Sequence, residues 1–323
     1  GAWAITTVFT FWPTMVKAVR MLGDSSEQGK LFGILEGGRG AASTVVSFIA
    51  LGMLAKLGEG LLGIRSIIIF YSVALIVIGI IAYFLLDDSK EEKEINKQTR
   101  GDIVHGIKKV VKMPEVWLVA ALVFTTYSAF SGLAFLTPYV TEIFGMSVAL
   151  GAFIGIIRSY VIMMLAPPIS GIIADKMHST IKFMIIGLTL SIIFTLVYVF
   201  MPGKSSFIIP VLINMLILSI ILLGMKGVFF APLDEVRVPR EYTGIAAGIV
   251  SFIGYVPDMF INSYYGGLLD SHPGIKGYNL IFLSMIALCV IGLICGIVLY
   301  KLVYSKKKES VGEKELEVAK LNS

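Results

Sequence analysis

Long apolar runs limit how this chain can fold more than any other feature of its sequence. Runs of about 20 residues with very few charges recur along nearly all of the 323 residues, and short polar stretches separate them. A helix of about 20 apolar residues crosses a hydrocarbon core of roughly 30 Å. A transmembrane barrel is excluded, because its strands of about 10 residues would alternate in polarity, whereas these runs are apolar on every face. The sequence therefore predicts an all-α, polytopic membrane helix bundle.

The composition agrees with a bilayer as solvent. Hydrophobic residues make up 56% of the chain and charged residues only 15%, with a mean hydropathy of +0.86. A water-soluble chain of this kind would expose large apolar patches. We expect about nine transmembrane helices, over residues 1–19, 31–55, 67–86, 116–140, 148–174, 181–201, 207–231, 243–269 and 278–302.

Lysine and arginine sort between alternate loops, which predicts the orientation. One side receives Lys17, Arg20, Lys30, the basic residues from Lys90 to Lys112, Lys176, Lys182, Arg237, Arg240 and the tail from Lys301. The other side receives only Lys56, Arg65, Lys204 and Lys276. By the positive-inside rule the richer side is cytoplasmic. We therefore expect a multi-pass protein of the plasma (inner) membrane with a cytoplasmic C-terminus and an N-terminus cut from a longer chain.

A long polar segment between the third and fourth runs predicts two bundles. The segment begins DDSKEEKEINKQTR and contains a short amphipathic stretch, Ile103 to Lys112, which we expect to lie as a helix on the inner membrane surface. Pro114 suits the first turn of the next span. The predicted domains are 1–87, the second half of an N-terminal bundle; 88–115, a cytoplasmic linker; 116–303, a six-helix bundle; and 304–323, a cytoplasmic tail.

This plan of three spans, a linker and six spans resembles the major facilitator superfamily. The loop Gly171-Ile-Ile-Ala-Asp175-Lys176 is similar to that family's G-x-x-x-D-[RK] loop in its second-half copy. The resemblance implies that the spans correspond to the family's helices 4 to 12, that helices 1 to 3 are absent, and that Gly171, Asp175 and Lys176 take part in conformational change. It also implies alternating access around a central site, in a monomer.

Three charged residues fall near the middle of predicted spans. Charge at that depth costs roughly 2.5 to 3.5 kcal/mol, so each charge needs a partner or a watery cavity. Glu36 lies three residues before Arg39 on one helix face, and Arg158 is about as deep in the fifth span. In one interpretation Glu36 neutralises an arginine in a structural ion pair. In the other, Arg39 and Arg158 hold an anionic substrate, with Glu36 at the site. The resemblance favours the second, because the superfamily's helices 5 and 8 meet beside the transport path, and branches that carry organic anions or organophosphates have similar basic residues.

Glu36 is also a candidate for coupling, and other polar residues within spans are candidates for coupling or substrate contact. Asp258 follows Pro257, which should loosen the helix, and its carboxyl could take up a proton or only cap freed backbone. Asn262 is one turn further on. Tyr127 is the candidate for substrate contact among the hydroxyls of the fourth span.

Lys226 has two expected roles, a position at a cavity or a simpler one. It lies near the inner end of its span, where a lysine can extend to the headgroups and pair with Asp234 or Glu235.

These features favour a secondary active transporter of a small organic anion, coupled to protons or another solute. The alternative is a solute sensor of the same fold that does not transport. We expect no enzyme, because no nucleophile with a base occurs at depth. No phosphate loop is present, and we expect no cofactor, no metal site and no nucleic-acid partner.

Overall fold

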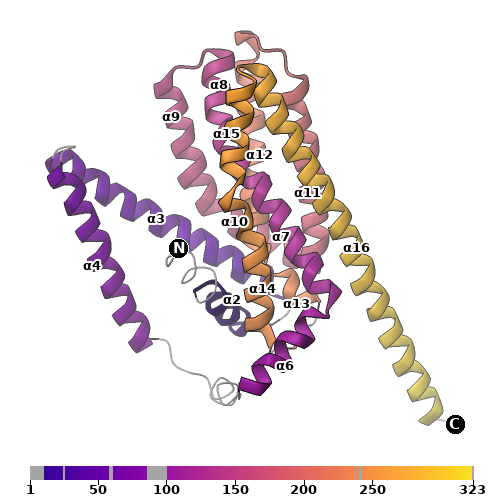
Figure 1. Ribbon diagram of the computed structural model, residues 1–323. Coiled ribbons are helices and arrows are strands. Elements are labelled where there is room, and N and C mark those ends of the chain that lie inside the picture. Colours follow the sequence, from indigo (N-terminus) through magenta and orange to yellow (C-terminus); the bar gives the residue numbers. More distant parts are fainter. Residues whose placement is uncertain are drawn as a thin grey trace. The chain divides into compact units, whose positions relative to one another are not determined.

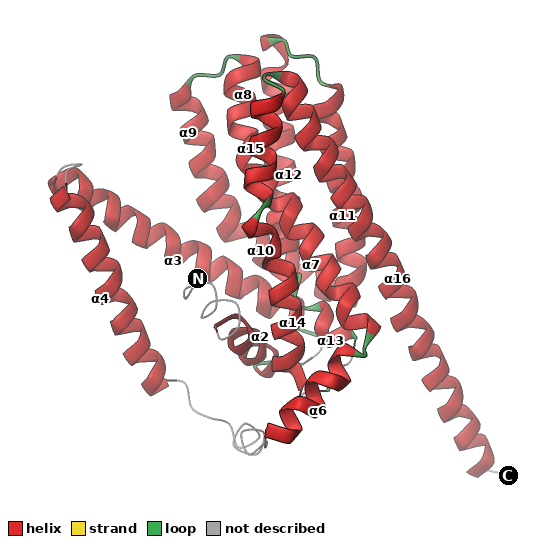
Figure 2. Cartoon of the chain, viewed as in Figure 1, coloured by secondary structure: helices red, strands yellow, loops and turns green. Residues whose placement is uncertain are grey.

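The computed structural model describes residues 11–24, 26–57, 61–85, 100–236, 238–239 and 242–321 (Figure 1). Within these residues every regular element is helical, and Figure 2 shows no strand among them. The all-α prediction is therefore confirmed. The chain divides into two units, residues 1–37 with 106–323, and residues 38–105, and each is described by itself.

Six described segments are long and apolar enough to cross a membrane, which confirms a polytopic membrane protein. They are Leu61–Ile81, Pro114–Phe144, Thr180–Phe200, Ser205–Val228, Thr243–Ser271 and Ile275–Ser305. The predicted total of nine spans stays a prediction. The first predicted span and the linker are described only in part, because residues 1–10 and 86–99 lie outside the described residues.

The helices before the fourth predicted span are α2 (Trp12–Met21), α3 (Gln28–Leu57), α4 (Leu61–Leu85) and α6 (Arg100–Val111). The helix expected at Ile103 to Lys112 corresponds to α6. The six-helix part comprises α7 (Pro114–Gly132), η2 (Leu133–Phe135), α8 (Leu136–Phe144), α9 (Val148–Ile156), η3 (Ile157–Ile162), α10 (Met163–Lys176), α11 (Thr180–Phe200), η4 (Ser205–Phe207), α12 (Ile208–Val228), α13 (Pro232–Glu235), α14 (Thr243–Tyr255), η6 (Val256–Met259), α15 (Ile261–Ser271) and α16 (Ile275–Leu321). Pro114 begins α7, as predicted. Beyond the last predicted span, α16 continues as helix through most of the predicted tail.

Three of the expected spans are broken helices rather than continuous ones. The run α7–α8 is interrupted by the 3-10 segment η2, α9–α10 by the π-helical segment η3, and α14–α15 by the 3-10 segment η6. Prolines at or just after the breaks, Pro138, Pro167 and Pro257, have no N–H for the i−4 carbonyl, which weakens the helical ladder there. Each break frees backbone groups inside a span.

Within the first unit, α7 lies at the centre of the six-helix part. It packs against α14 and α16, while α11 packs on α16 and α10 on α12 (Figure 1). Large aliphatic side chains such as Ile186 and Ile193 on α11 are exposed. In a bilayer those side chains meet lipid, whereas in water they would form an unfavourable apolar surface.

The start of α3 and helix α12 both approach α10 very closely. A Cβ at Gly33 would collide with the backbone of Pro167, and a Cβ at Gly227 would collide with the Pro167 ring. A Cβ at Gly171 would collide with the backbone carbonyl of Gly29. These small residues allow the backbones to touch, as is usual for helix packing in membranes. We call this three-helix contact the α10 seam.

Candidate functional site

An open cavity of about 310 Å³, lined by both apolar and polar side chains, lies among the helices of the six-helix part. Four of the residues predicted from the sequence line it together: Tyr127 from α7, Arg158 from η3, Asp258 from η6 and Asn262 from α15. Phe130 also forms part of the wall. Two of these four residues come from the helix breaks, η3 and η6, so the breaks bring charged groups and freed backbone to one place. Broken helices around a central site are typical of secondary transporters.

The π-helical segment positions Arg158. Its Nη1 donates a hydrogen bond to the backbone carbonyl of Leu133, the first residue of the break η2. A guanidinium carries five N–H donors in a planar fork, so this contact fixes the orientation of the group and leaves donors that can face the cavity. An oriented guanidinium at the wall of a cavity is well suited to bind a carboxylate, phosphate or sulfonate.

Asp258 and Tyr127 form a hydrogen-bonded pair in the wall. The Tyr127 hydroxyl donates to the Asp258 Oδ2 at 3.0 Å. The Tyr127 ring is held edge-to-face against Tyr255, with centroids 4.9 Å apart, and tilted against Phe130 at 5.8 Å. The 3-10 turn that begins just before Pro257 presents the Asp258 carboxylate to the cavity, so the proline break expected from the sequence is present.

Lys226 corrects one expectation directly. It does not pair with Asp234 or Glu235; its Nζ lies 3.4 Å from the Glu36 Oε2, and both side chains are largely buried, at 12% and 6% exposure. The ammonium also lies 4.8 Å from the centroid of the Phe130 ring, directly behind the cavity wall. The expectation failed because Asp234 and Glu235 make other contacts, with Arg20 and with the start of α11.

The charges at this site balance. Among the described residues, Arg158 and Asp258 line the cavity, and Lys226 and Glu36 adjoin its wall. Two cations and two carboxylates make the empty site neutral when all four are ionised. Arg39 is not part of this count, because it belongs to the second unit and its position relative to the cavity is not described.

The predicted loop motif lies at the end of α10. Asp175 accepts hydrogen bonds from the backbone N–H groups of Gly29 and Lys30, at 2.8 and 2.7 Å, and so caps α3. Burial raises the pKa of the Asp175 carboxyl, and the two backbone hydrogen bonds partly offset this. Gly171 lies one turn earlier and allows the close contact with Gly29, while Lys176 is exposed.

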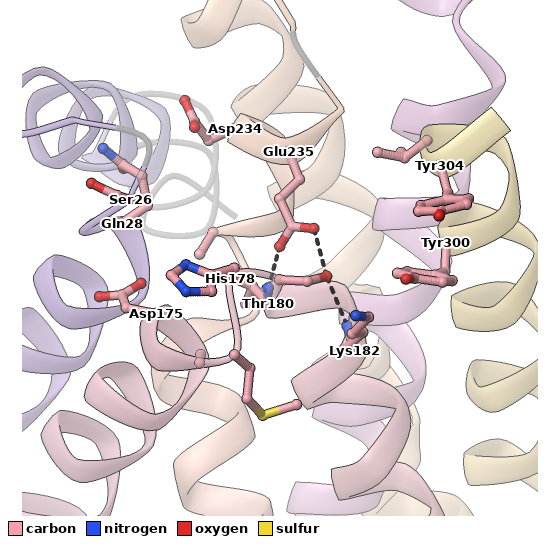
Figure 3. Close-up of a pocket in the computed structure, with 15 residues that line it drawn as sticks. Ser26, Gln28, Asp175, His178, Thr180, Lys182, Asp234, Glu235, Tyr300 and Tyr304 are labelled. Atoms are coloured by element: carbon pink, nitrogen blue, oxygen red, sulfur yellow. Dashed lines mark hydrogen bonds between the residues drawn. The ribbon is translucent and has the colours of Figure 1, made fainter. Parts of the chain in front are cut away.

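Two further polar contacts lie at the same end of the first unit. Arg20 of α2 pairs with Asp234 at 2.9 Å and donates to the hydroxyl of Thr243 at 3.0 Å. Glu235 accepts from the Ser179 hydroxyl and from the backbone N–H groups of Thr180 and Ile181, which caps α11 (Figure 3).

A second cavity lies at this end of the first unit. Its volume is about 590 Å³, and Asp175, Asp234 and Glu235 line it (Figure 3). Burial raises the pKa of Glu235, and its hydrogen bonds act in the opposite direction.

The sequence reasoning missed the partner of Lys226 and the π-helical segment. Gly224 and Gly227 on either side of Lys226 were a usable signal, because small residues flanking a charge suggest a buried helix contact rather than a headgroup position. The adjacent Pro167 and Pro168 were a signal for an irregular span. No local pattern pointed to the contact between Arg20 and Asp234.

The broken spans, the central cavity and the comparisons with known proteins together define a multi-pass membrane transporter. The family model of the Major Facilitator Superfamily matches residues 1–262. The chain therefore belongs to the Major Facilitator Superfamily.

Relatives and a solved structure agree with this assignment. The chain is 36% identical to the inner membrane protein YihN of Escherichia coli (strain K12), over 96% of this chain and 76% of YihN. It is 29% identical to the inner membrane protein YqcE of the same organism, over 89% of this chain and 69% of YqcE. A crystal structure of a bacterial homologue of the iron transporter ferroportin, in an outward-facing state, matches with a TM-score of 0.66 and 14% identity, over 93% of this chain and 69% of that one. At that identity the match concerns the fold alone.

Proposed function

We propose that the protein carries a small organic anion across the membrane together with a proton, by alternating access. The observation that carries this proposal is the neutral set of four charges at the central cavity, in which an oriented Arg158 faces the same space as Asp258. Arg158 binds the anionic group of the substrate. Tyr127 and Asn262 contact its polar remainder, and Asp258 is the proton-carrying residue.

Charge balance explains why an anion would bring a proton with it. The empty site is neutral, with Arg158 and Lys226 against Asp258 and Glu36. A bound monoanion leaves one excess negative charge within a membrane-spanning part of the chain, which is unfavourable unless it is neutralised. Protonation of Asp258 restores neutrality, because this carboxylate borders the cavity whereas Glu36 is paired behind the wall. The expected stoichiometry is one proton per monoanion, with no net charge moved.

Contacts at one end of the first unit support the alternating-access part of the proposal. The capping of α3 by Asp175 and the pair of Arg20 with Asp234 tie the chain before the linker to the six-helix part. Such contacts must open if the cavity is to become accessible from that side. By the predicted orientation this end is cytoplasmic.

The test is transport by the protein at its full natural length in sealed proteoliposomes. A pH gradient, acidic outside, is imposed, and uptake of labelled organic monoanions is followed, with small hydroxycarboxylates, sugar phosphates and sulfonates as the panel. The proposal expects concentrative uptake of at least one class that collapses when a protonophore removes the gradient. Saturable binding without any uptake would instead support the sensor, and uptake of cations or neutral solutes alone would refute the anion assignment.

A further inference from the structure

Lys226 lies between two carboxylates that belong to different parts of the structure. Its ammonium is 3.4 Å from Glu36 of α3. Asp258, on η6, borders the cavity that the Phe130 ring also lines. The centroid of that ring is 4.8 Å from the ammonium. Lys226 thus lies between the cavity and α3.

The backbone around Lys226 is held tightly against α10. Gly224 and Gly227 keep α12 against Ser170 and Pro167 of α10, where any Cβ would collide. A lysine side chain has a flexible four-carbon stem and an ammonium that can point its three donors in several directions. Its present distance to Glu36 is longer than the 2.7 to 2.9 Å typical of strong charged hydrogen bonds. The ammonium can therefore turn without movement of the helix.

A buried charge that loses its partner raises the free energy of the folded protein, whereas a charge that changes to another partner stays compensated. We propose that Lys226 is the coupling residue of the transport cycle, and that its ammonium changes from Glu36 to Asp258 when Asp258 gives up its proton. This inference rests on the proposed function. With Asp258 protonated, Lys226 pairs with Glu36 and holds α3 in the α10 seam. With Asp258 ionised, Lys226 can leave the Glu36 pairing seen in this structure and turn toward Asp258, and the hold on α3 is then weakened.

The exchange needs only movement of a proton. Water on the side of substrate entry supplies the proton to Asp258, and water on the side of release accepts it. Lys226 remains an ammonium throughout, and Glu36 remains a carboxylate. Among the described residues, Arg158 lines the same cavity as Asp258, Lys226 of α12 lies against the Phe130 ring of that cavity, and Tyr127 donates a hydrogen bond to Asp258.

A charge reversal separates this role from that of a static ion pair. The variant Glu36→Lys/Lys226→Glu keeps the pair but places a carboxylate beside Asp258. If Lys226 interacts with both carboxylates, Asp258→Asn lowers the melting temperature of the unchanged protein, because it removes a partner of the ammonium. The same substitution raises the melting temperature of the reversed protein, because it removes the repulsion between two carboxylates. We expect each shift to be at least about 2 °C.

The melting experiment uses the purified full-length protein without substrate, so it does not depend on transport. The proposal is overturned if Asp258→Asn has the same effect in both backgrounds. If the reversed variant does not fold, Lys226→Gln replaces it: Asp258→Asn must then lower the melting temperature less than in the unchanged protein, and an equal loss overturns the proposal.

Transport then tests the coupling itself. We expect proteoliposomes with Glu36→Gln/Lys226→Gln to exchange labelled for unlabelled anion, while proton-driven uptake falls at least about tenfold. The reason is that this variant has no ammonium at position 226 that could change its partner when Asp258 loses its proton. A static ion pair predicts that this double variant recovers proton-driven uptake. If the unchanged protein moves no anion at all, the proposed function fails, and the melting experiment still decides whether Lys226 serves Asp258.

Discussion

The Tyr127 hydroxyl and the Asp258 carboxylate, 131 residues apart in the chain, meet at 3.0 Å in the wall of the central cavity. The hydroxyl comes from the interior of α7 and the carboxylate from a 3-10 turn made at a proline. The hydrogen bond stabilises the ionised carboxylate and fixes its direction. A substrate that needs either group must therefore compete with this bond.

Tyr127→Phe is expected to lower proton-driven uptake about 3- to 10-fold, the effect of about 1 kcal/mol from one hydrogen bond. The ring contacts with Tyr255 and Phe130 remain in this variant, so the fold should be unchanged. Initial uptake rates in proteoliposomes measure the effect, and melting of the purified protein is the control. Rates equal to those of the unchanged protein would remove the hydroxyl from the transport site.

Asp258→Asn should separate exchange from net transport. The variant leaves Arg158 and Lys226 against Glu36 alone, so an anion binds without a proton, and the empty site keeps one excess positive charge. We expect exchange of labelled for unlabelled anion to persist, while uptake driven by a pH gradient is lost. Retained proton-driven accumulation would show that another residue carries the proton.

Arg158→Ala should abolish uptake at low substrate concentration. Loss of a charged hydrogen bond of about 1.5 to 3 kcal/mol raises the half-saturating concentration about 10- to 150-fold. Arg158→Lys keeps the charge without the fork and should recover only part of this loss. Uptake across a concentration series measures the change. An unchanged half-saturating concentration in the alanine variant would exclude Arg158 from anion binding.

The features of the fold and the cavity that could be predicted from the sequence are those set by residues close together in the chain. The apolar runs near Val116 and Ile181 predicted spans correctly, because span length is a local property set by the bilayer. The depth of Arg158 and Asp258 in their runs was enough to select them, since charge at depth needs a reason. The pair of Lys226 with Glu36 was not predictable, because the two residues are 190 positions apart and nothing local fixes which helix faces which.

The irregular helix around Arg158 shows a second limit. Hydropathy depends on composition and cannot distinguish an α-helix from a π-helix. The fifth run therefore predicts one continuous span. Pro167 and Pro168 signalled an irregularity, yet the π-helical segment, Ile157–Ile162, lies before them and depends on packing. Segments of this kind often occur at functional sites, so the prolines could have added weight to Arg158.

Gly171→Ala tests the α10 seam by steric means. The new methyl group would collide with the Gly29 carbonyl, so α3 must move away or α10 must bend, and overpacking of this kind costs about 1 to 3 kcal/mol. We expect a lower melting temperature and reduced uptake. Gly155→Ala in α9 is the matched control, because its added methyl group would meet no atom within 4 Å apart from its chain neighbours and the nearby backbone of its own helix. Equal behaviour of the two variants would mean that α3 does not depend on this close contact.

Asp175→Asn tests the cap on α3 and its pH dependence. The amide oxygen can accept from Gly29 or Lys30, but its NH₂ group cannot accept from the other, so about 0.5 to 2 kcal/mol of capping is lost. Burial raises the pKa of Asp175. In the unchanged protein the cap should therefore weaken as the pH falls through that raised value, because the carboxylate takes up a proton.

The labelling rates of Asp175→Asn and the unchanged protein are therefore expected to differ by an amount that depends on pH. A cysteine introduced near the start of α3 should react faster with a thiol reagent in Asp175→Asn than in the unchanged protein at neutral pH, and the two rates should converge in acid. Burial also means that the folded protein holds the Asp175 proton more tightly than the unfolded chain does. Protonation of Asp175 thus weakens the cap but does not by itself lower the stability of the folded protein. The melting temperature should therefore not fall together with the strength of the cap. Equal labelling rates at neutral pH would show that the Asp175 carboxylate does not hold α3.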